Sequence, residues 1–378
     1  MRRRHAGAAD ARLDAVALSV PAAAPPLRIV NAMLGRGLGG LEQALLDYGD
    51  ALSRFGHEVH AVIHPDAAVR PALVARGALW HGLPHRGSWD VIAAIRLRLL
   101  LRGLHADVCI AHGNRAMSLL RQAGARPLIA VLPNYKMRCR GAAAVFHPTL
   151  DLKRHARSQG VSDTCLHHIP SMVDVPPAPP PRVRRQPPVI GAMGRFVPKK
   201  GFDIFIAALG LLRSQGVPFR AILAGDGPER STLEQLAARH GLAEALAFPG
   251  WVHDKRTFFA GVDLFCLPSH HEPFGIVLIE AMAQAMPIVS TDSEGPSEIL
   301  HDGSDGILVP RGNIERLAQA LGGLIADPER AAQLGAGAYR NARETYDMPC
   351  VGARLDVAVR RAVQGMPRLT ADEIGATA

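Results

Sequence analysis

The sequence lacks the long apolar run that a membrane-spanning helix requires. No uninterrupted apolar window reaches the ~18 residues needed, so we expect no segment to cross a bilayer. The chain opens on Met-Arg-Arg-Arg-His, which resembles the basic start of a signal peptide, but Asp10, Arg12 and Asp14 interrupt any apolar core. We therefore expect residues 1–26, which are rich in Ala, Pro and Arg, to form a disordered tail.

Cysteine is scarce and scattered. The five cysteines lie at positions 109, 139, 165, 266 and 350, and no two are close enough in the sequence to suggest a zinc motif or a disulfide framework. This usage is typical of a reducing compartment. It favours a cytoplasmic protein.

The composition is that of an ordinary globular protein, but its charge is uneven. Apolar residues make up 48% and charged residues 20% of a 378-residue chain, a length that suits two domains. Residues 1–188 hold 25 Lys and Arg against 12 Asp and Glu, a net charge of +13, whereas residues 189–378 hold 18 against 22, a net charge of −4. This division predicts that the first domain meets a polyanion, for which anionic lipid and nucleic acid are the candidates.

Residues 262–290 show the clearest strand-helix-strand pattern. The apolar run 262–267 predicts a buried strand, and apolar residues at helical spacing over 274–285 predict a helix that begins at Pro273. A helix N-terminus offers free N–H groups and partial positive charge to an anion, and Gly275 lets that anion approach the backbone. The unit therefore predicts an anion site.

Two glutamates of this unit are spaced for one long ligand and not for hydrolysis. Glu272 and Glu280 would lie about 12 Å apart along a helix at ~1.5 Å per residue, whereas the paired carboxylates of a glycoside hydrolase lie roughly 5 to 9.5 Å apart. They would therefore touch opposite ends of an anionic, hydroxyl-rich ligand. By spacing alone, a capping Glu272 and a solvated Glu280 explain the pattern equally well.

The stretch from Glu272 to Glu280, Glu-Pro-Phe-Gly-Ile-Val-Leu-Ile-Glu, resembles the E-x7-E signature of retaining, nucleotide-sugar-dependent glycosyltransferases of family 4, which have the GT-B fold. The resemblance implies that Glu272 contacts the transferred sugar and that Glu280 binds the ribose hydroxyls. It further implies that backbone groups hold the sugar and the diphosphate at Phe274, Gly275 and Ile276.

A pair of cations precedes this unit. The predicted strand 189–193 leads to Arg195 and, five residues later, to Lys200, and two cations on a strand-to-helix turn suit a diphosphate. The pattern Gly-Arg-x4-Lys-Gly is similar to the diphosphate clamp of the same family, although a basic surface turn is the alternative. Residues 248–254 resemble the family segment whose backbone meets the nucleobase, which makes Val252 its neighbour.

The first domain opens with the predicted strand 27–34 and a glycine-rich turn. Its glycines at 35, 37 and 40 fit the dinucleotide fingerprint G-x-G-x-x-G, so an NAD-dependent oxidoreductase is an alternative. That fingerprint also needs an acidic residue near the end of the second strand, 58–63, and none stands there. In the family, adjacent glycines of this loop lie over the donor diphosphate, which implicates Gly39 and Gly40.

A histidine follows the next predicted strand, 107–111. The family places a polar residue at this strand tip facing the transferred sugar, which makes His112 the candidate catalytic partner of Glu272. Alternatively, His112 is a hydrogen-bonded turn residue.

Residues 88–105 predict a cationic amphipathic helix. Arg96, Arg98 and Arg102 alternate with aliphatic residues, which is typical of a helix that lies on an acidic membrane surface. An outer helix with solvated arginines explains the pattern equally well. The basic loop 134–140 would face an acceptor that bears phosphate or carboxylate.

The sequence predicts an α/β protein with the GT-B fold, in which two Rossmann-like, doubly wound domains face each other across a cleft. The expected divisions are the tail 1–26, an acceptor-side domain 27–175, a Pro-rich linker 176–188, a nucleotide-sugar-binding domain 189–345, a helix 346–365 that crosses back to the first domain, and a tail 366–378.

The resemblance implies an enzyme that transfers a hexose or related sugar from a nucleoside-diphosphate sugar, such as a UDP-sugar. The implied acceptor is a cell-envelope glycolipid, either a lipopolysaccharide core or a lipid-linked or phosphorylated glycan. No cofactor is expected, and no metal, because no Asp-x-Asp pair stands at a strand end. We expect peripheral association with an anionic membrane and no nucleic-acid partner. A catalytically idle sugar-nucleotide-binding protein is a further alternative.

Overall fold

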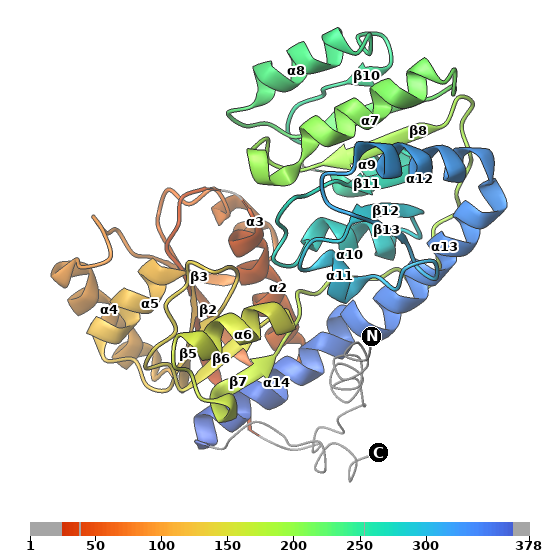
Figure 1. The fold of residues 1–378 in the computed structure, drawn as a ribbon. Helices are drawn as coiled ribbons and strands as arrows, with labels where there is room; N and C mark the ends of the chain where they lie inside the picture. The colour runs from red at the N-terminus through yellow and green to blue at the C-terminus, as the bar shows by residue number, and fades with distance from the viewer. Residues whose placement is uncertain (1–24, 38, 253, 366–378) are drawn as a thin grey trace. The chain divides into compact units, whose positions relative to one another are not determined.

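The computed structural model describes residues 25–37, 39–252 and 254–365. The described residues divide into two compact units: unit 1 comprises those up to Met172 and from Met348 onwards, and unit 2 is Val173–Asp347 (Figure 1). Positions 1–24 of the predicted N-terminal tail and the whole predicted tail 366–378 lie outside the described residues.

Unit 1 is built on a parallel seven-stranded sheet in the order β3-β2-β1-β4-β5-β6-β7. Its strands are β1 (Arg28–Met33), β2 (Glu58–Ile63), β3 (Leu79–Gly82), β4 (Val108–His112), β5 (Leu128–Val131), β6 (Ala144–His147) and β7 (Leu166–His168). Its helices are α2 (Gly40–Arg54), α3 (Arg70–Ala75), α4 (Val91–Leu104), α5 (Asn114–Ala123), α6 (Leu150–Ser158) and α14 (Met348–Gln364), with a 3-10 turn at Asp163–Cys165.

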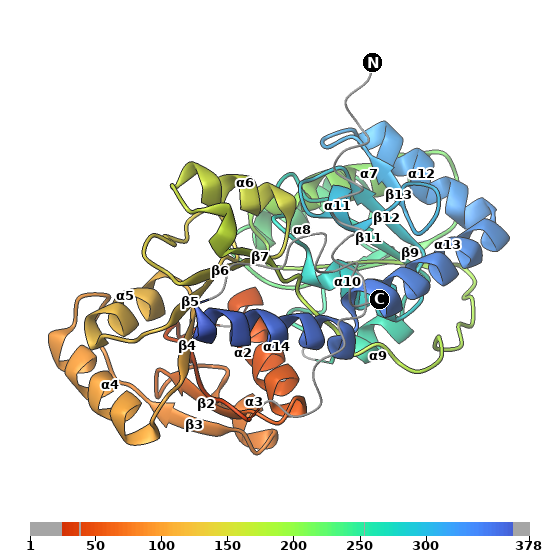
Figure 2. The ribbon, with the colours of Figure 1, turned by 90° about the horizontal axis from the view of Figure 1, so that it is seen from below.

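Helices cover both faces of this sheet. Helices α4 and α5 pack on one face, whereas α2 and α14 pack together on the other, where Figure 2 shows them side by side. The central strand β4 is buried along its whole length, as expected for a parallel sheet covered on both sides. The last helix, α14, thus belongs to the core of unit 1.

Unit 2 is built on a parallel six-stranded sheet in the order β10-β9-β8-β11-β12-β13. Its strands are β8 (Val189–Met193), β9 (Arg220–Ala224), β10 (Leu246–Ala247), β11 (Leu264–Leu267), β12 (Ile288–Thr291) and β13 (Ile307–Val309). Its helices are α7 (Phe202–Ser214), α8 (Arg230–Arg239), α9 (Lys255–Ala260), α10 (Ile276–Ala283), α11 (Pro296–Ile299), α12 (Ile314–Ala326) and α13 (Pro328–Asn341), with a 3-10 turn at Pro198–Lys200 and a π-helical turn at Ala342–Tyr346.

The Pro-rich segment 176–188 is part of unit 2. Arg182 donates to the carbonyl oxygens of Val262 and Gln284, and Arg185 pairs with Asp263 at 3.4 Å. The chain therefore enters unit 2 at Val173, before the predicted linker, and side-chain contacts hold this segment on the unit.

Two helix boundaries differ from the prediction. Helix α10 begins at Ile276 and not at Pro273. Gly275 has a φ of +103°, a left-handed conformation that cannot lie inside a right-handed helix, so the helix starts only after it. Helix α14 begins at Met348, two residues after the predicted start, and ends at Gln364. Among the described residues, no helix combines the length and apolar character needed to cross a bilayer.

Candidate functional site

The predicted polar residues of unit 2 follow the ends of neighbouring parallel strands. Arg195 comes after β8, and Glu272 comes after β11. Because these strands are parallel, both residues lie at the carboxyl edge of the sheet, where open α/β sheets bind ligands. Arg195 is exposed, and no acidic side chain of the described residues pairs with it.

Glu272 is buried and bound by Lys200. The Lys200 ammonium forms an ion pair with Oε2 of Glu272, and the Ser269 hydroxyl lies 3.4 Å from the same oxygen. The tertiary structure thus joins, across 72 residues, the two side chains that the resemblance assigns to the diphosphate and the sugar.

The Lys200 turn and the Glu272 loop approach each other closely. The backbone N–H groups of His270 and His271 donate to the carbonyl oxygen of Lys199 at 2.9 and 3.2 Å. A Cβ atom at Gly201 would lie 2.2 Å from the carbonyl oxygen of Pro268, so only glycine permits this approach. The glycine of the Lys-Gly motif therefore fixes the position of Lys200 relative to Glu272.

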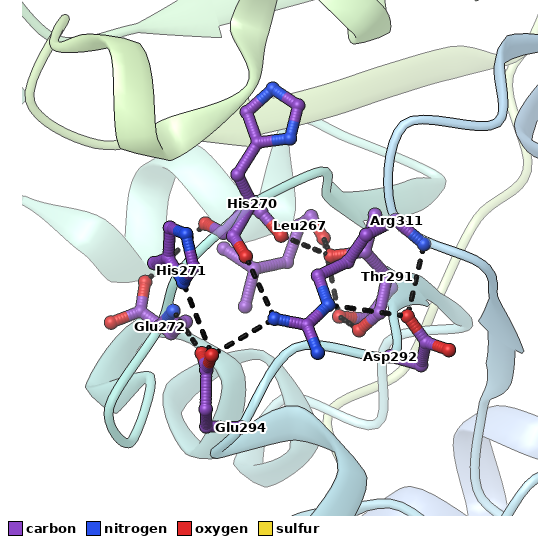
Figure 3. A network of polar contacts seen from close by, with 10 residues as sticks. Leu267, His270, His271, Glu272, Thr291, Asp292, Glu294 and Arg311 are labelled. Atoms are coloured by element: carbon purple, nitrogen blue, oxygen red, sulfur yellow. Dashed lines mark hydrogen bonds and ion pairs between the residues drawn. The ribbon is translucent and has the colours of Figure 1, made fainter.

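A network that the sequence did not reveal holds the backbone of Glu272 (Figure 3). The N–H of Glu272 donates to Oε2 of Glu294 at 3.1 Å, and its carbonyl oxygen accepts from the N–H of Gly295 at 2.8 Å. Arg311, after β13, donates to Glu294 at 2.9 Å and to the carbonyl oxygen of His270 at 3.2 Å. The ends of β12 and β13 thus position the Glu272 loop.

Glu294 is held as a carboxylate. Burial would raise its pKa, but hydrogen bonds from its own backbone, from His271 and from the Glu272 N–H, together with the Arg311 charge, bring the pKa below its ordinary value. Glu294 and Arg311 stand outside any motif, and the only signal in the sequence is that Glu294 follows the predicted strand-helix-strand unit 262–290.

The first turn of α10 presents free backbone donors. No side chain caps this helix. The N–H of Leu278 donates to the Gly275 carbonyl oxygen at 2.8 Å, which leaves the N–H groups of Ile276 and Val277 without a partner among the described residues. Phe274 is buried beneath the turn, so the predicted contacts at Phe274, Gly275 and Ile276 are backbone positions beside Glu272.

Glu280 is not the solvated residue that spacing alone allowed. Its Oε1 pairs with Nζ of Lys255 at 2.6 Å, and its Oε2 is buried with no hydrogen-bond partner among the described residues. Burial raises the pKa of Glu280, and the Lys255 charge opposes that shift. A buried acceptor without a partner is the arrangement that a ligand hydroxyl would complete. Lys255 was missed because it belongs to no motif.

Val252, the predicted neighbour of the nucleobase, precedes α9. It is partly buried and packs against the apolar cluster that contains Phe258 and Phe274. The next residue lies outside the described ranges.

His112 is the last residue of β4 and is buried. Its Nε2 lies 2.7 Å from Oδ1 of Asn31, whose amide donates to the carbonyl oxygen of Leu45, so Nε2 carries the proton. Burial lowers the pKa of His112 to about 3, which keeps the ring neutral. Its Nδ1 is a buried acceptor without a partner among the described residues.

Gly39 and Gly40 form the N-terminus of α2. Gly39 has an extended φ of 171°, so its backbone conformation does not itself require glycine. Strand β2 ends at Ile63 and is followed by His64, so the acidic residue of the NAD fingerprint is absent there.

The described cysteines are all free, and no group of three or more His, Cys, Asp or Glu within the described ranges could hold a metal ion. Metal independence remains a prediction.

Comparison with known proteins assigns the family. Residues 179–341 match the model of the family described as glycosyl transferases group 1. The lipopolysaccharide core biosynthesis glycosyltransferase LpsD of Rhizobium meliloti (strain 1021) is 30% identical over 329 residues, which covers 84% of this chain and 94% of that relative. LpsE of the same organism is 44% identical over 140 residues, 37% of this chain and 40% of that relative.

Solved structures show the same architecture. The chain is similar to Anabaena Alr3699/HepE in complex with UDP and glucose, with a TM-score of 0.78, 22% identity and coverage of 88% of this chain and 99% of that one. It is also similar to a sucrose-phosphate synthase from Thermosynechococcus elongatus, with a TM-score of 0.73, 16% identity and coverage of 89% and 99%. The protein therefore has the GT-B fold.

The chain belongs to the group 1 glycosyl transferases. It is a nucleotide-sugar-dependent glycosyltransferase, which confirms the predicted family and enzyme class and leaves the NAD-dependent alternative without support.

Proposed function

We propose that this glycosyltransferase transfers a hexose or related sugar, with retention, from a nucleoside-diphosphate sugar to a cell-envelope glycolipid. The observation that carries the proposal is the Lys200–Glu272 pair beside the free N–H groups of α10, with the exposed Arg195 on the neighbouring strand end. This arrangement offers cations and backbone donors to a diphosphate and a carboxylate to the sugar next to it.

The proposed chemistry assigns each group a role. The bond between C1 of the sugar and the diphosphate oxygen breaks, and a bond from an acceptor hydroxyl oxygen to C1 forms on the same face. The hydroxyl proton passes to the departing phosphate. Arg195 and Lys200 stabilise the charge that develops on that phosphate, which is commonly the largest catalytic contribution and needs no metal here. Glu272 positions the sugar, because its backbone and carboxylate are both held in place.

In this proposal the nucleotide is bound by the part of the site that contains Glu280 and Val252. Glu280 offers its unpartnered Oε2 to a ribose hydroxyl, and the backbone at Val252 meets the base. Structural neighbours contain UDP or UDP-glucose, and a relative from Mycolicibacterium smegmatis is named as GDP-mannose-dependent, so UDP- and GDP-sugars are the donors to test first.

The names of the relatives favour a lipid-linked acceptor, since several act in lipopolysaccharide core biosynthesis. Helix α4 supports this. Ile92, Ile95 and Leu99 are 63%, 55% and 62% exposed, so its apolar stripe faces solvent. Arg96 and Arg102 are also exposed, so that apolar and basic groups share the outer surface. Such a face fits the anionic cytoplasmic leaflet of a membrane, where the enzyme would act peripherally.

The test of the proposed donor site compares Lys200→Ala and Arg195→Ala with Lys199→Ala, the exposed neighbour. Each of the first two removes a charge-assisted contact worth about 1.5 to 3 kcal/mol, so we expect calorimetry to show nucleoside-diphosphate affinity roughly ten- to hundredfold weaker, and donor hydrolysis to fall. Lys199→Ala should resemble the wild type.

Unchanged affinity in both clamp variants would contradict the assignment of Arg195 and Lys200. A wild type that binds UDP, GDP or ADP but neither hydrolyses nor transfers any of the corresponding sugars would support the catalytically idle alternative.

A further inference from the structure

Four basic side chains that the proposed reaction does not use meet at the carboxyl edge of the unit 1 sheet. Arg36, His64, His85 and Arg115 follow β1, β2, β3 and β4, respectively. Arg115 and His85 both lie within hydrogen-bond distance of the Leu34 carbonyl oxygen, at 2.8 and 3.1 Å. The Arg36 guanidinium lies 3.0 Å from Nε2 of His64, and the two imidazole ring centres are 5.1 Å apart. The two arginines are exposed above two buried histidines.

The Arg36 guanidinium and the His64 ring lie close together, but they do not form a hydrogen bond when Nδ1 of the neutral ring accepts from Asp66. The backbone N–H of Asp66 lies 3.1 Å from Nδ1 of His64, while Arg36 lies beside Nε2. A neutral imidazole has one lone pair, so it cannot accept from both donors. The Asp66 N–H is part of the backbone, whereas Arg36 is an exposed side chain that can turn away. Arg36 is therefore available to a ligand.

His85 also lacks a partner. Its Nε2 donates to the Leu34 carbonyl oxygen, which leaves Nδ1 buried and without a hydrogen-bond partner among the described residues. The residue is 9% exposed, so water does not readily replace that partner.

Acidic side chains do not neutralise this cluster. None of the described Asp or Glu side chains pairs with Arg36 or Arg115. The Asp66 carboxylate is exposed and lies 3.6 Å from Nδ1 of His64, on the side of the ring away from Arg36. Glu42 lies beside Gly35, where burial raises its pKa, and it forms no ion pair with either arginine among the described residues.

We propose that Arg36, Arg115, His64 and His85 form an oxyanion site that binds a phosphoryl or carboxylate group of the glycan acceptor. Two guanidinium groups and the Nε2–H of His64 provide directed N–H donors to an oxyanion, and His85 adds a donor at Nδ1 when its ring is protonated. The assignment to the acceptor rests on the proposed function, in which the cations of unit 2 bind the donor diphosphate. A donor diphosphate is the other possible source of the same chemistry, and the experiment separates the two.

Sulfate is a suitable probe, because it is tetrahedral and keeps its charge between pH 6 and pH 8. The full chain is titrated with sulfate at constant ionic strength, with and without saturating UDP, by calorimetry and by NMR of the histidine rings. We expect wild-type binding to persist in UDP and to shift the signals of His64 and His85. Arg36→Gln and Arg115→Gln should each weaken sulfate binding roughly ten- to hundredfold. Arg96→Gln, which removes the same charge from α4, should bind as the wild type does.

The pH dependence provides a second readout. Burial is the largest cause that lowers the pKa of both His64 and His85, and the charges of Arg36 and Arg115 lower it further. The Asp66 carboxylate opposes the shift at His64 and the hydrogen bond to Leu34 opposes it at His85, whereas the charge of His64 adds to the lowering at His85. A bound anion favours the imidazolium, so binding takes up protons and the affinity should increase severalfold as the pH falls from 8 to 6. His85→Gln should flatten this dependence.

Displacement of sulfate by UDP would assign the cluster to the donor and overturn the proposal. Equal sulfate affinity in the wild type, Arg36→Gln and Arg115→Gln, with circular dichroism showing folded variants, would overturn it as well. Donor hydrolysis measured on the same samples tests the proposed function separately, because the sulfate site does not depend on turnover.

Discussion

Glu280 and Lys255 form an ion pair in which the lysine charge favours the ionised form of the buried glutamate. A buried carboxylate oxygen without a partner is costly unless a ligand completes it, and the second oxygen is neutralised by a lysine that is 38% exposed. The pair thus leaves one acceptor ready for a ribose hydroxyl while its counterion stays in place.

At the residue scale we predict that removing the Lys255 charge makes the stability of the protein depend on pH through Glu280. Lys255→Met removes the charge that opposes the burial of Glu280, so the carboxyl group should bind a proton more readily in the folded state than in the unfolded chain. Stability is then retained below the unfolded pKa of about 4.5 and lost as the pH rises through the higher folded pKa. We expect the free energy of unfolding at pH 7 to fall by about 1 to 3 kcal/mol, less than for a fully buried pair because Lys255 is partly solvated. Urea denaturation from pH 4.5 to 8 measures this.

The matched control is Glu280→Gln with Lys255→Met, which should lack the added pH dependence because the titrating group is gone. Glu280→Gln alone should weaken nucleotide binding about tenfold with the fold intact. A Lys255→Met protein with the wild-type pH profile would contradict the predicted coupling.

At the scale of the element, the three arginines predicted to lie on one face of α4 have different tertiary contacts. Arg98 donates to the carbonyl oxygens of Gln122 and Ala123, at the end of α5, at 3.1 and 3.0 Å. It therefore holds two helices together and is not available to a membrane in the way that Arg96 and Arg102 are.

We accordingly predict that Arg96→Glu with Arg102→Glu will reduce binding to liposomes that contain anionic lipid. Each basic residue near an acidic leaflet contributes about 1 kcal/mol, so losing two should reduce partitioning about thirtyfold, and charge reversal should reduce it further. Sedimentation at low and high salt checks this, since the attraction falls off over a Debye length of roughly 8 Å at physiological salt.

Two arginines of unit 2, Arg213 and Arg239, supply the control. Both are exposed, and their replacement by glutamate changes the net charge equally. Equal losses in the two double variants would mean that overall charge, and not α4, drives binding. Leu99→Ser should weaken membrane binding at high salt too, because it removes apolar contact.

At the scale of the whole molecule, the chain returns to unit 1 to complete its core. Asp356 of α14 is 0% exposed, and its Oδ1 accepts from Nε2 of His57 at 2.6 Å and from Nε of Arg360 at 2.8 Å. Nδ1 of His57 accepts from the N–H of Leu27 at 3.0 Å, which fixes the tautomer that donates to Asp356. His57 therefore links the residue that precedes β1 to α14, the last described helix of the unit.

We predict that Asp356→Ala destabilises unit 1 strongly. The substitution leaves the buried His57 N–H and the Nε–H of Arg360 without their acceptor, which should lower the free energy of unfolding by about 2 to 5 kcal/mol. Asp356→Asn keeps one oxygen acceptor and should cost less. Guanidinium denaturation and hydrogen exchange of β1 and α2 provide the measurements. Equal stability in Asp356→Ala and the wild type would show that apolar packing alone holds α14.

Local patterns in the sequence predicted the central strands and the motifs. The strands 58–63 and 189–193 have the predicted bounds, because strands in a sheet covered on both faces are short and largely apolar. Strands β3 and β7 were not predicted. They lie at the two edges of their sheet, where partial exposure admits residues such as His81 and His168 and removes the apolar signal.

The sequence by itself determined which chemical groups this glycosyltransferase carries at its strand ends, because motifs such as Gly-Arg-x4-Lys-Gly and E-x7-E are local in the chain. Only the tertiary structure decided what those groups contact. Lys200 meets Glu272 across 72 residues, and Glu294 and Lys255 meet the two motif glutamates across 22 and 25. Parallel strands return to the same edge only after a crossover of variable length, so no fixed spacing records these contacts. The tertiary structure also decides whether a charged side chain is free for a ligand or already paired, because burial and the number of donors around each acceptor depend on how distant parts of the chain pack.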